Sequence, residues 1–340
     1  MVKWTKKEGC GVRRTLAACC TGHFLVDFAC AFLLFRALWG EADWNGLLLT
    51  YNFCAFAVQM PLGLLADRWE RDGLTAAAGT AAVALAYGLA DAPWLAVVLA
   101  GLGNAAFHVG GGLEVLSLSG DRGGPLGLFV SPGAVGLFLG SLLGKGRSFP
   151  LWLVPVLLLF AAGALLWARQ ERPKRAAGHL EPCPALPLLL LLAVVVLRSY
   201  VGMTLTFPWR GTGQWALLLT LGMALGKAAG GYLADRFGPR RTAVGSLTVS
   251  SALLLASSIP ACGAVAVLCF NMTMPLTLWA AARRLPDARG FSFGLLTFGL
   301  FLGFLPAAFG AQALSGTAAA IWAAVSLLLL LPGLGRAVDK

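Results

Sequence analysis

The stretch Pro61–Asp72 reads P-L-G-L-L-A-D-R-W-E-R-D, and the stretch Ala229–Arg240 reads A-G-G-Y-L-A-D-R-F-G-P-R. The two aspartates of this shared phrase, Asp67 and Asp235, lie about half a chain apart. Each copy ends an apolar stretch and begins a short basic loop. Because both copies follow an even-numbered apolar stretch, they indicate a parallel internal duplication in a membrane protein.

The composition predicts that lipid surrounds the chain. Hydrophobic residues make up 58% of the sequence and charged residues 12%, whereas soluble domains carry about 25% charged residues. About 20 apolar residues cross a bilayer as a helix. We therefore expect an all-α integral membrane protein with twelve transmembrane helices in two pseudo-symmetric six-helix halves, at 15–38, 46–66, 74–90, 94–117, 125–144, 149–168, 188–207, 213–234, 242–259, 262–283, 291–308 and 314–333.

The division into halves follows from the longest connection. Residues 169–187 contain four prolines and six charged residues, which is typical of a flexible linker. The prediction is an N-terminal half at 1–168, a cytoplasmic linker at 169–187 and a C-terminal half at 188–340.

The net charge of +11 is distributed unevenly. Basic residues precede the first span and follow the even-numbered spans, whereas Lys145, Arg147 and Arg210 are the basic residues of the opposite loops. Basic loops stay in the cytoplasm, so we expect a multi-pass protein of the cell membrane with both termini cytoplasmic. This distribution argues against nucleic acid as the partner and makes the lipid bilayer the expected one.

Ionisable residues at bilayer depth are functional candidates, because charges there are costly. Asp27 lies about 18 Å into the first span, and His23 lies one turn earlier on the same helix face. We expect this pair to bind protons, with a structural tie between helices as the alternative.

Four further polar residues are candidates for a substrate cavity. Arg198 lies about 15 Å into the seventh span and can either bind an anionic substrate or pair with Asp27. Asn104 and His108 share one face of the fourth span, and Tyr200 is a weaker candidate. No histidine, cysteine or carboxylate spacing indicates a metal site or a nucleophile, so we expect no metal, no cofactor and no enzymatic activity.

The paired phrases resemble the signature loop of the major facilitator superfamily. The stretch Gly22–Asp27, the stretch Gly103–His108, Met274–Thr277 and Arg289–Gly290 are similar to the fosmidomycin resistance protein branch of that superfamily. The chain departs from the pattern at Glu70, where glycine is usual, and it has no arginine in the fourth span. Ser131-Pro132-Gly133 matches the antiport-associated element of the fifth span only loosely.

The resemblance implies a conformational latch at each loop. In the family, the loop aspartate meets the positive N-terminus of a helix from the opposite half and pairs with a loop arginine. We therefore expect Asp67 to meet the helix that begins near Gly290, and Asp235 the helix that begins near Pro125. The latch residues expected here are Gly63, Asp67, Arg68, Arg71, Gly231, Asp235, Arg236 and Arg240.

The function expected from these features is secondary active transport by alternating access. The resemblance implies proton-coupled efflux of a small anionic or amphipathic compound by a monomeric antiporter. The alternatives are an uptake symporter or uniporter of the same fold, a membrane-embedded enzyme that uses His23, Asp27 and His108, and a sensor that has lost transport.

Overall fold

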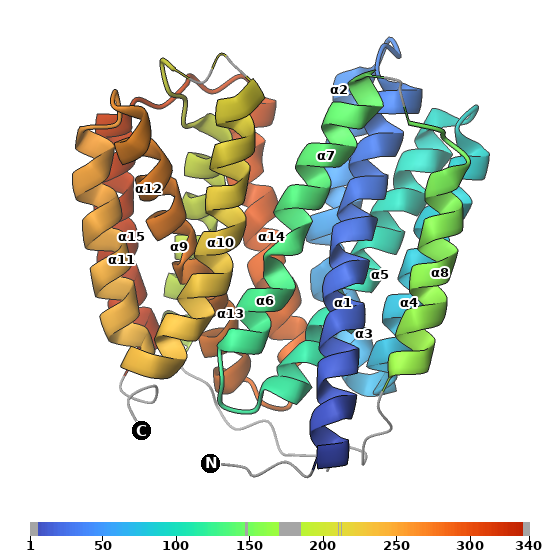
Figure 1. The fold of residues 1–340 in the computed structure, drawn as a ribbon, viewed down its shortest axis with the longest axis horizontal. Helices are drawn as coiled ribbons and strands as arrows, with labels where there is room; N and C mark the ends of the chain where they lie inside the picture. Colours follow the sequence, from blue (N-terminus) through green and yellow to red (C-terminus); the bar gives the residue numbers. More distant parts are fainter. Residues whose placement is uncertain (1–5, 147–148, 170–184, 210, 212, 336–340) are drawn as a thin grey trace.

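A computed structural model of the chain describes residues 6–146, 149–169, 185–209, 211 and 213–335. Helices form its regular structure, apart from one isolated bridge between Leu205 and Leu314. They fall into two groups along the chain, α1–α8 and α9–α15, which lie side by side in Figure 1. Residues 170–184 of the predicted linker lie outside the described residues, so the half boundaries stay a prediction.

The helices of the first group occupy the stretches predicted as spans one to six. Two stretches contain a short π-helical segment, which is common near functional sites. Their bounds are α1 Lys6–Leu33, η1 Leu34–Leu38, α2 Trp44–Asn52, η2 Phe53–Ala57, α3 Gln59–Trp69, α4 Asp72–Ala86, η3 Tyr87–Leu89, α5 Pro93–Ser119, α6 Gly124–Val130, α7 Pro132–Gly146 and α8 Leu153–Ala168.

The second group occupies the remaining predicted stretches. Its first helix begins at Ala185, so three residues expected in the linker form its first turn, where proline is tolerated. The bounds are α9 Ala185–Thr204, α10 Gly213–Phe237, α11 Pro239–Leu255, α12 Pro260–Asn271, α13 Thr273–Arg284, α14 Arg289–Ala308 and α15 Gly316–Leu334.

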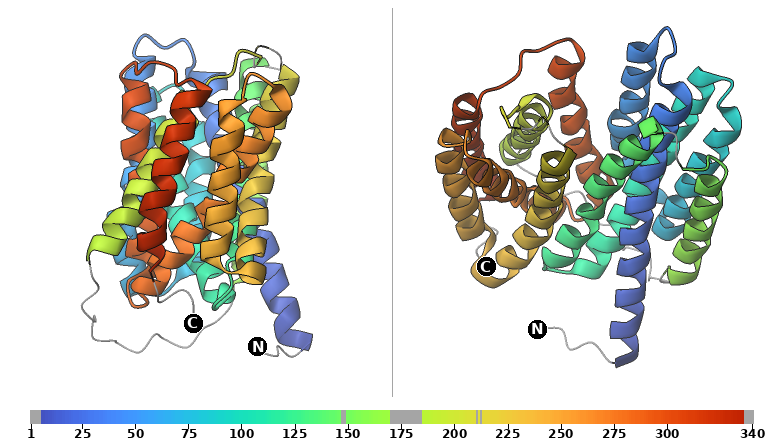
Figure 2. Two further views of the ribbon diagram at one scale, coloured as in Figure 1. Left: turned by 90° about the vertical axis from the view of Figure 1, so that its left-hand side faces the viewer. Right: turned by 45° about the horizontal axis from the view of Figure 1, so that its top comes forward.

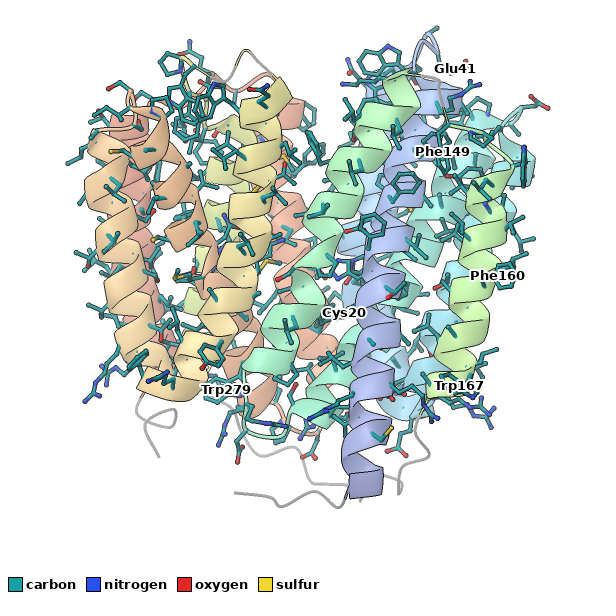
Figure 3. All side chains as sticks on the ribbon, viewed as in Figure 1. Cys20, Glu41, Phe149, Phe160, Trp167 and Trp279 are labelled. Atoms are coloured by element: carbon teal, nitrogen blue, oxygen red, sulfur yellow. The ribbon has the colours of Figure 1, made fainter. Side chains whose placement is uncertain are left out.

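Nine helices of the described residues are long and apolar enough to cross a membrane, and α8 is a shorter apolar helix. The count of twelve spans therefore stays a prediction. The outer surface is apolar, as a lipid solvent requires: Phe160 and Trp167 of α8 are 75% and 69% exposed and point away from the bundle (Figure 3).

The helices run roughly parallel between two ends of the bundle (Figure 2). The helix α1 begins and α15 ends at the same end, which we call the terminal end (Figure 1). Trp279 lies at this end, and Glu41 lies at the other (Figure 3). The terminal end is the one predicted to be cytoplasmic.

A row of glycines brings α7 against α1. A Cβ at Gly136 would lie 3.1 Å from the Phe28 backbone nitrogen, and one at Gly144 would lie 3.1 Å from the Phe32 carbonyl oxygen. Such rows allow close packing where lipid supplies no hydrophobic drive between helices. The row fixes the helix that carries His23 and Asp27.

We predict that Gly140→Ala destabilises the protein. Its new Cβ would lie 2.9 Å from the Phe28 carbonyl carbon and 3.0 Å from the Ala31 Cβ, and overpacking of this kind costs about 1–3 kcal/mol. Thermal unfolding of the purified protein in detergent measures the loss. The matched control is Gly163→Ala on the exposed side of α8, where no atom lies within 4 Å; equal melting temperatures for the two variants would contradict the prediction.

Candidate functional site

A cavity of about 250 Å³ lies between the two groups of helices, near the lower end of the range for small-ligand pockets. Its wall is mostly apolar. The charged or titratable residues that line it are His23, Asp27, His108, Arg198 and Lys227. The first three come from α1 and α5, and the two cations come from α9 and α10.

Three of these side chains form a cluster at the cavity wall. The Nε2 atoms of His23 and His108 are 3.0 Å apart. The carboxylate of Asp27 lies 3.3 Å from the His23 Nε2 and 3.7 Å from the His108 Nε2. Asn104 donates from Nδ2 to the Asp27 Oδ1 at 3.1 Å, so it supports the cluster although it does not line the cavity itself.

Backbone carbonyls fix which nitrogen of each histidine carries a hydrogen. The His23 Nδ1 lies 2.6 Å from the Phe129 carbonyl oxygen, and the His108 Nδ1 lies 2.9 Å from the Asn104 carbonyl oxygen. A carbonyl only accepts, so we assign a hydrogen to both Nδ1 atoms. In the neutral histidines both Nε2 atoms are then acceptors.

One additional proton would supply the donor that this set of acceptors lacks. Without it, two Nε2 lone pairs and a carboxylate converge on one another, which is electrostatically unfavourable. One proton on either Nε2 supplies a donor to the other Nε2 and to Asp27. The short distances observed fit an imidazolium–carboxylate arrangement in which one proton is shared among three acceptors.

The helix break between α6 and α7 shapes this cluster. Pro132 has no backbone N–H, so the helix is interrupted there, and the Phe129 carbonyl just before the break receives the His23 hydrogen bond. Gly133, in the first turn of α7, lies beside the cluster, and a Cβ at this position would overlap the His23 Nε2 and the Asp27 Oδ2. The element that matched its family pattern only loosely is thus in contact with the candidate proton site.

The same three side chains could hold a metal ion, since one ligand atom from each lies within 4.8 Å of the others. Sequence spacing does not reveal this set of three possible ligands, because His108 is far from His23 and Asp27 along the chain. The fold brings His108 of α5 into contact with the two α1 side chains. The two cations in the same cavity oppose a divalent ion electrostatically.

Arg198 is buried and held by hydroxyl groups. It donates to Thr273 at 2.8 Å and to Thr277 at 3.4 Å. Both threonine hydroxyls donate to backbone carbonyls, Thr273 to Phe270 at the end of α12 and Thr277 to Met274 of α13, so their oxygens are oriented to accept. The Arg198 Nε has no partner, and the Asp27 carboxylate contacts the histidines and Asn104 instead of this guanidinium.

Lys227 of α10 is the second cation of the cavity. The structure places its side chain on the cavity wall. Among the described residues, no carboxylate lies within ion-pair distance of Lys227 or Arg198. Their positive charge therefore exceeds the single negative charge of Asp27 in this cavity.

Tyr200 does not line this cavity, and its ring lies against Trp322 of α15 with the centroids 6.2 Å apart. Gln59 lines the cavity, is fully buried and has an Oε1 without a partner. Sequence reasoning did not single out Phe129 or Thr273, which carry no charge within an apolar run, and it named Gly133 and Thr277 only as parts of motifs that resemble the family.

Both latch aspartates bind a helix N-terminus across the two groups of helices. Asp67 accepts from the backbone N–H of Gly290 at 2.8 Å and of Phe291 at 2.9 Å, at the start of α14. Asp235 accepts from the backbone N–H of Gly123 at 2.6 Å and of Gly124 at 2.9 Å, at the start of α6. The contacts expected near Gly290 and Pro125 are both present.

The glycines of the paired phrases lie at the closest backbone approach. A Cβ at Gly63 would overlap the Gly290 carbonyl, and a Cβ at Gly231 would lie 2.5 Å from the Gly123 carbonyl oxygen. Glu70 and Gly238 occupy equivalent positions, with φ of 52° and 88°. The unusual Glu70 thus adopts the left-handed conformation that favours glycine there.

The arginines of the two loops lie at the exposed surface of the terminal end. A further ion pair, missed by the sequence analysis, joins the two groups of helices: Arg283 donates from Nη1 to the Asp121 carboxylate at 2.5 Å. The exposed loop arginines are Arg68, Arg71, Arg236 and Arg240.

Comparison with known proteins identifies the fold. No protein-family model and no curated protein matches the sequence. Among solved structures, the chain is similar to the E. coli fucose:proton symporter FucP (12% identity, TM-score 0.67, 94% of this chain and 98% of that one) and to the human organic anion transporter MFSD10 (20%, 0.61, 95% and 99%). A bacterial homologue of the iron transporter ferroportin in an outward-facing state is also similar (14%, 0.62, 94% and 97%). The chain therefore has the fold of major facilitator superfamily transporters.

We predict that Asp235→Asn loosens the terminal end. The substitution removes the charge that interacts with the α6 N-terminus and places an NH₂ group near backbone donors. The contact is weakened by about 1 kcal/mol, which raises the population of molecules with the contact open about fivefold. Hydrogen exchange at the Gly123 and Gly124 amides should accelerate by that factor. Asp91→Asn, an exposed change in the loop before α5, is the control; unchanged exchange in Asp235→Asn would contradict the prediction.

Proposed function

We propose that this chain is a secondary active transporter that moves a small amphipathic anion across the cell membrane by alternating access, coupled to protons. The observation that carries the proposal is a cavity whose proton-binding cluster comes from one group of helices and whose cations come from the other. Relative motion of the two groups would expose both kinds of site together to one side and then to the other.

The latches support the alternating-access part of the proposal. Asp67 and Asp235 close the terminal end with four backbone hydrogen bonds between the groups. The ion pair between Arg283 and Asp121 adds a contact at this end. Such contacts can break as a unit, which is the property of a two-state element.

The wall of the cavity supports the choice of substrate class. Phe56, Leu137, Met223, Phe293 and Leu296 offer apolar surface, while Arg198 and Lys227 offer positive charge. A molecule with a compact apolar body and one anionic group would satisfy both. The small volume favours a compound of a few ring or chain atoms over a large drug-like molecule.

Two directions of transport follow from different observations. Efflux by antiport is what the resemblance to the fosmidomycin resistance branch implies. Uptake by symport is favoured by the excess positive charge of the cavity. An imposed proton gradient across proteoliposomes that contain the protein separates them, since the labelled anion is extruded in one case and accumulated in the other.

The alternative to transport is catalysis by a membrane-embedded enzyme that uses His23, Asp27 and His108. The structures similar to this chain are described as transporters, which favours transport over catalysis. A metal assay on the purified protein tests the rival directly, because the three side chains resemble a ligand set.

We predict that Asp27→Asn abolishes proton-driven transport in proteoliposomes while leaving downhill exchange of the anion partly active. Asparagine keeps the size and the acceptor oxygen but cannot stabilise an imidazolium by its charge. Proton-gradient-driven flux and anion exchange are measured side by side. Proton-driven flux at the wild-type rate would remove Asp27 from the mechanism.

We predict that Arg198→Ala weakens binding of benzenesulfonate more than binding of the neutral benzenesulfonamide. A hydrogen bond to a charged group is worth about 1.5–3 kcal/mol, so the difference should be tenfold or more. Arg198→Lys should recover part of the anion affinity because it restores the charge without the planar fork. Equal losses for the two ligands would reject charge recognition by Arg198.

A further inference from the structure

Each side chain of the His23–Asp27–His108 cluster is oriented by a polar partner behind it. The Nδ1–H of His23 donates to the Phe129 carbonyl, and the Nδ1–H of His108 donates to the Asn104 carbonyl. The Asn104 side chain donates to the Asp27 carboxylate. Metal-binding histidines and carboxylates are held by partners of this kind, which point the remaining lone pairs at the ion.

We propose that His23, Asp27 and His108 bind a divalent transition-metal ion through the two Nε2 atoms and the carboxylate, with a further coordination position open to the cavity. The inference goes beyond the proposed transport function and does not depend on it.

The spacing of the ligand atoms fits such an ion. Ligands at about 2.0–2.1 Å from a tetrahedral Zn²⁺ lie about 3.3–3.4 Å from one another. The two Nε2 atoms are 3.0 Å apart, and the nearest carboxylate oxygens lie 3.3 Å from the His23 Nε2 and 3.7 Å from the His108 Nε2. The last two distances use different oxygens of Asp27, so the carboxylate can bind the ion through either oxygen or both.

The chemistry of the ligands selects the class of metal. Imidazole nitrogen suits zinc and its neighbours in the first transition row, whereas Mg²⁺ and Ca²⁺ prefer sites made of oxygen atoms. With a hydrogen on each Nδ1, the neutral histidines present lone pairs at both Nε2 atoms. These lone pairs face one another at 3.0 Å, and a cation between them converts their repulsion into attraction.

The backbone leaves space at the cluster. A Cβ at Gly133 would overlap the His23 Nε2 and the Asp27 Oδ2, so any other residue there would block the ligand atoms. All three ligand residues line the cavity of about 250 Å³. An ion held by them is therefore within reach of water or of a small anion that occupies the cavity.

The two cations of the cavity set an electrostatic condition for this site. Arg198 and Lys227 line the same cavity and repel a metal ion, and the charge of Asp27 offsets only half that of a divalent ion. A carboxylate that enters the cavity can bind the open position of the ion and also offset the charge of the two cations. The ion and a small carboxylate should therefore raise each other's affinity.

Binding of Zn²⁺ and Co²⁺ to the purified full chain, freed of any polyhistidine tag, tests the inference. Calorimetry in phosphatidylcholine nanodiscs measures the Zn²⁺ affinity, and visible absorption of Co²⁺ distinguishes intense four-coordinate from weak six-coordinate spectra. We expect one ion per chain, an intense Co²⁺ spectrum and no competition by Mg²⁺. Benzoate should change this spectrum and tighten Zn²⁺ binding, whereas the neutral benzyl alcohol should do neither.

Variants test the assignment of the ligands. His23→Asn and His108→Asn keep a donor in place of Nδ1–H but remove Nε2, so each should weaken Zn²⁺ binding by more than the 10–100-fold that loss of an orienting partner costs. Asn104→Leu removes only the amide that orients Asp27 and should weaken binding about tenfold. His179→Asn is the matched control, because His179 is the third histidine of the chain and lies outside the described residues.

Several results would overturn the inference. These are no saturable Zn²⁺ binding by the wild-type chain, equal binding by the wild type and the His23 and His108 variants, or a six-coordinate Co²⁺ spectrum that benzoate leaves unchanged. If a histidine variant does not fold, X-ray absorption at the zinc edge of the wild-type protein decides the question. Fewer than two imidazole ligands in that spectrum would reject the site.

The outcomes also separate this inference from the proposed function. Proton-driven flux by a chain that binds no Zn²⁺ would reject the metal site and leave the proposed function intact. Zn²⁺ binding that requires His23 and His108, without any proton-driven flux, would reject the proposed function and leave the metal site intact.

Discussion

A charge inside a lipid-surrounded helix bundle has to be balanced by groups of the protein itself, and this constraint organises the structure. Asp27 is balanced by two histidines and an amide, and Arg198 by two threonine hydroxyls. The latch aspartates use the free N–H groups of helix ends. Each of these sets of contacts joins helices that are distant in the chain, so the contacts that balance the buried charges also hold the helices together.

The short helix α6 connects two of these solutions. Its first N–H groups bind Asp235, and its Phe129 carbonyl binds His23. Seven residues of α-helix span about 10 Å, so a latch and the proton cluster share one rigid element of this length. The break at Pro132 separates α6 from α7, which remains packed on α1 through its glycine row. If Asp235 acts as the proposed latch, a shift of α6 on its release would change the hydrogen bond that orients His23.

The sequence predicted those parts of the site that depend on local spacing or on a repeated motif. His23 and Asp27 are four residues apart on one helix, and the resemblance of the two paired phrases led to the helix ends near Gly290 and Pro125. The third member of the cluster depends on how α5 packs against α1, which no local spacing reveals, and Thr277 looks like any small polar residue in an apolar helix. Tyr200 was an aromatic residue near Arg198 in the chain, but its side chain packs against Trp322. The span count was inferred from apolar length, which does not specify where a helix passes out of the lipid, and the linker was inferred from its prolines and charged residues.

The net charge of the cavity limits which of its states can reorient under the proposed function. The empty cavity has the charges of Asp27, Arg198 and Lys227, which leave it with an excess of one positive charge. A bound proton adds one positive charge and a bound monoanion adds one negative charge, so the doubly loaded cavity has the same net charge as the empty one. A cavity with the anion alone has no net charge, whereas a cavity with the proton alone has an excess of two positive charges, which is the most costly of the four states to enclose in a low-dielectric interior. Electrostatics therefore disfavours reorientation of a cavity that holds the proton without the anion, and under the proposed function this opposes a leak of protons.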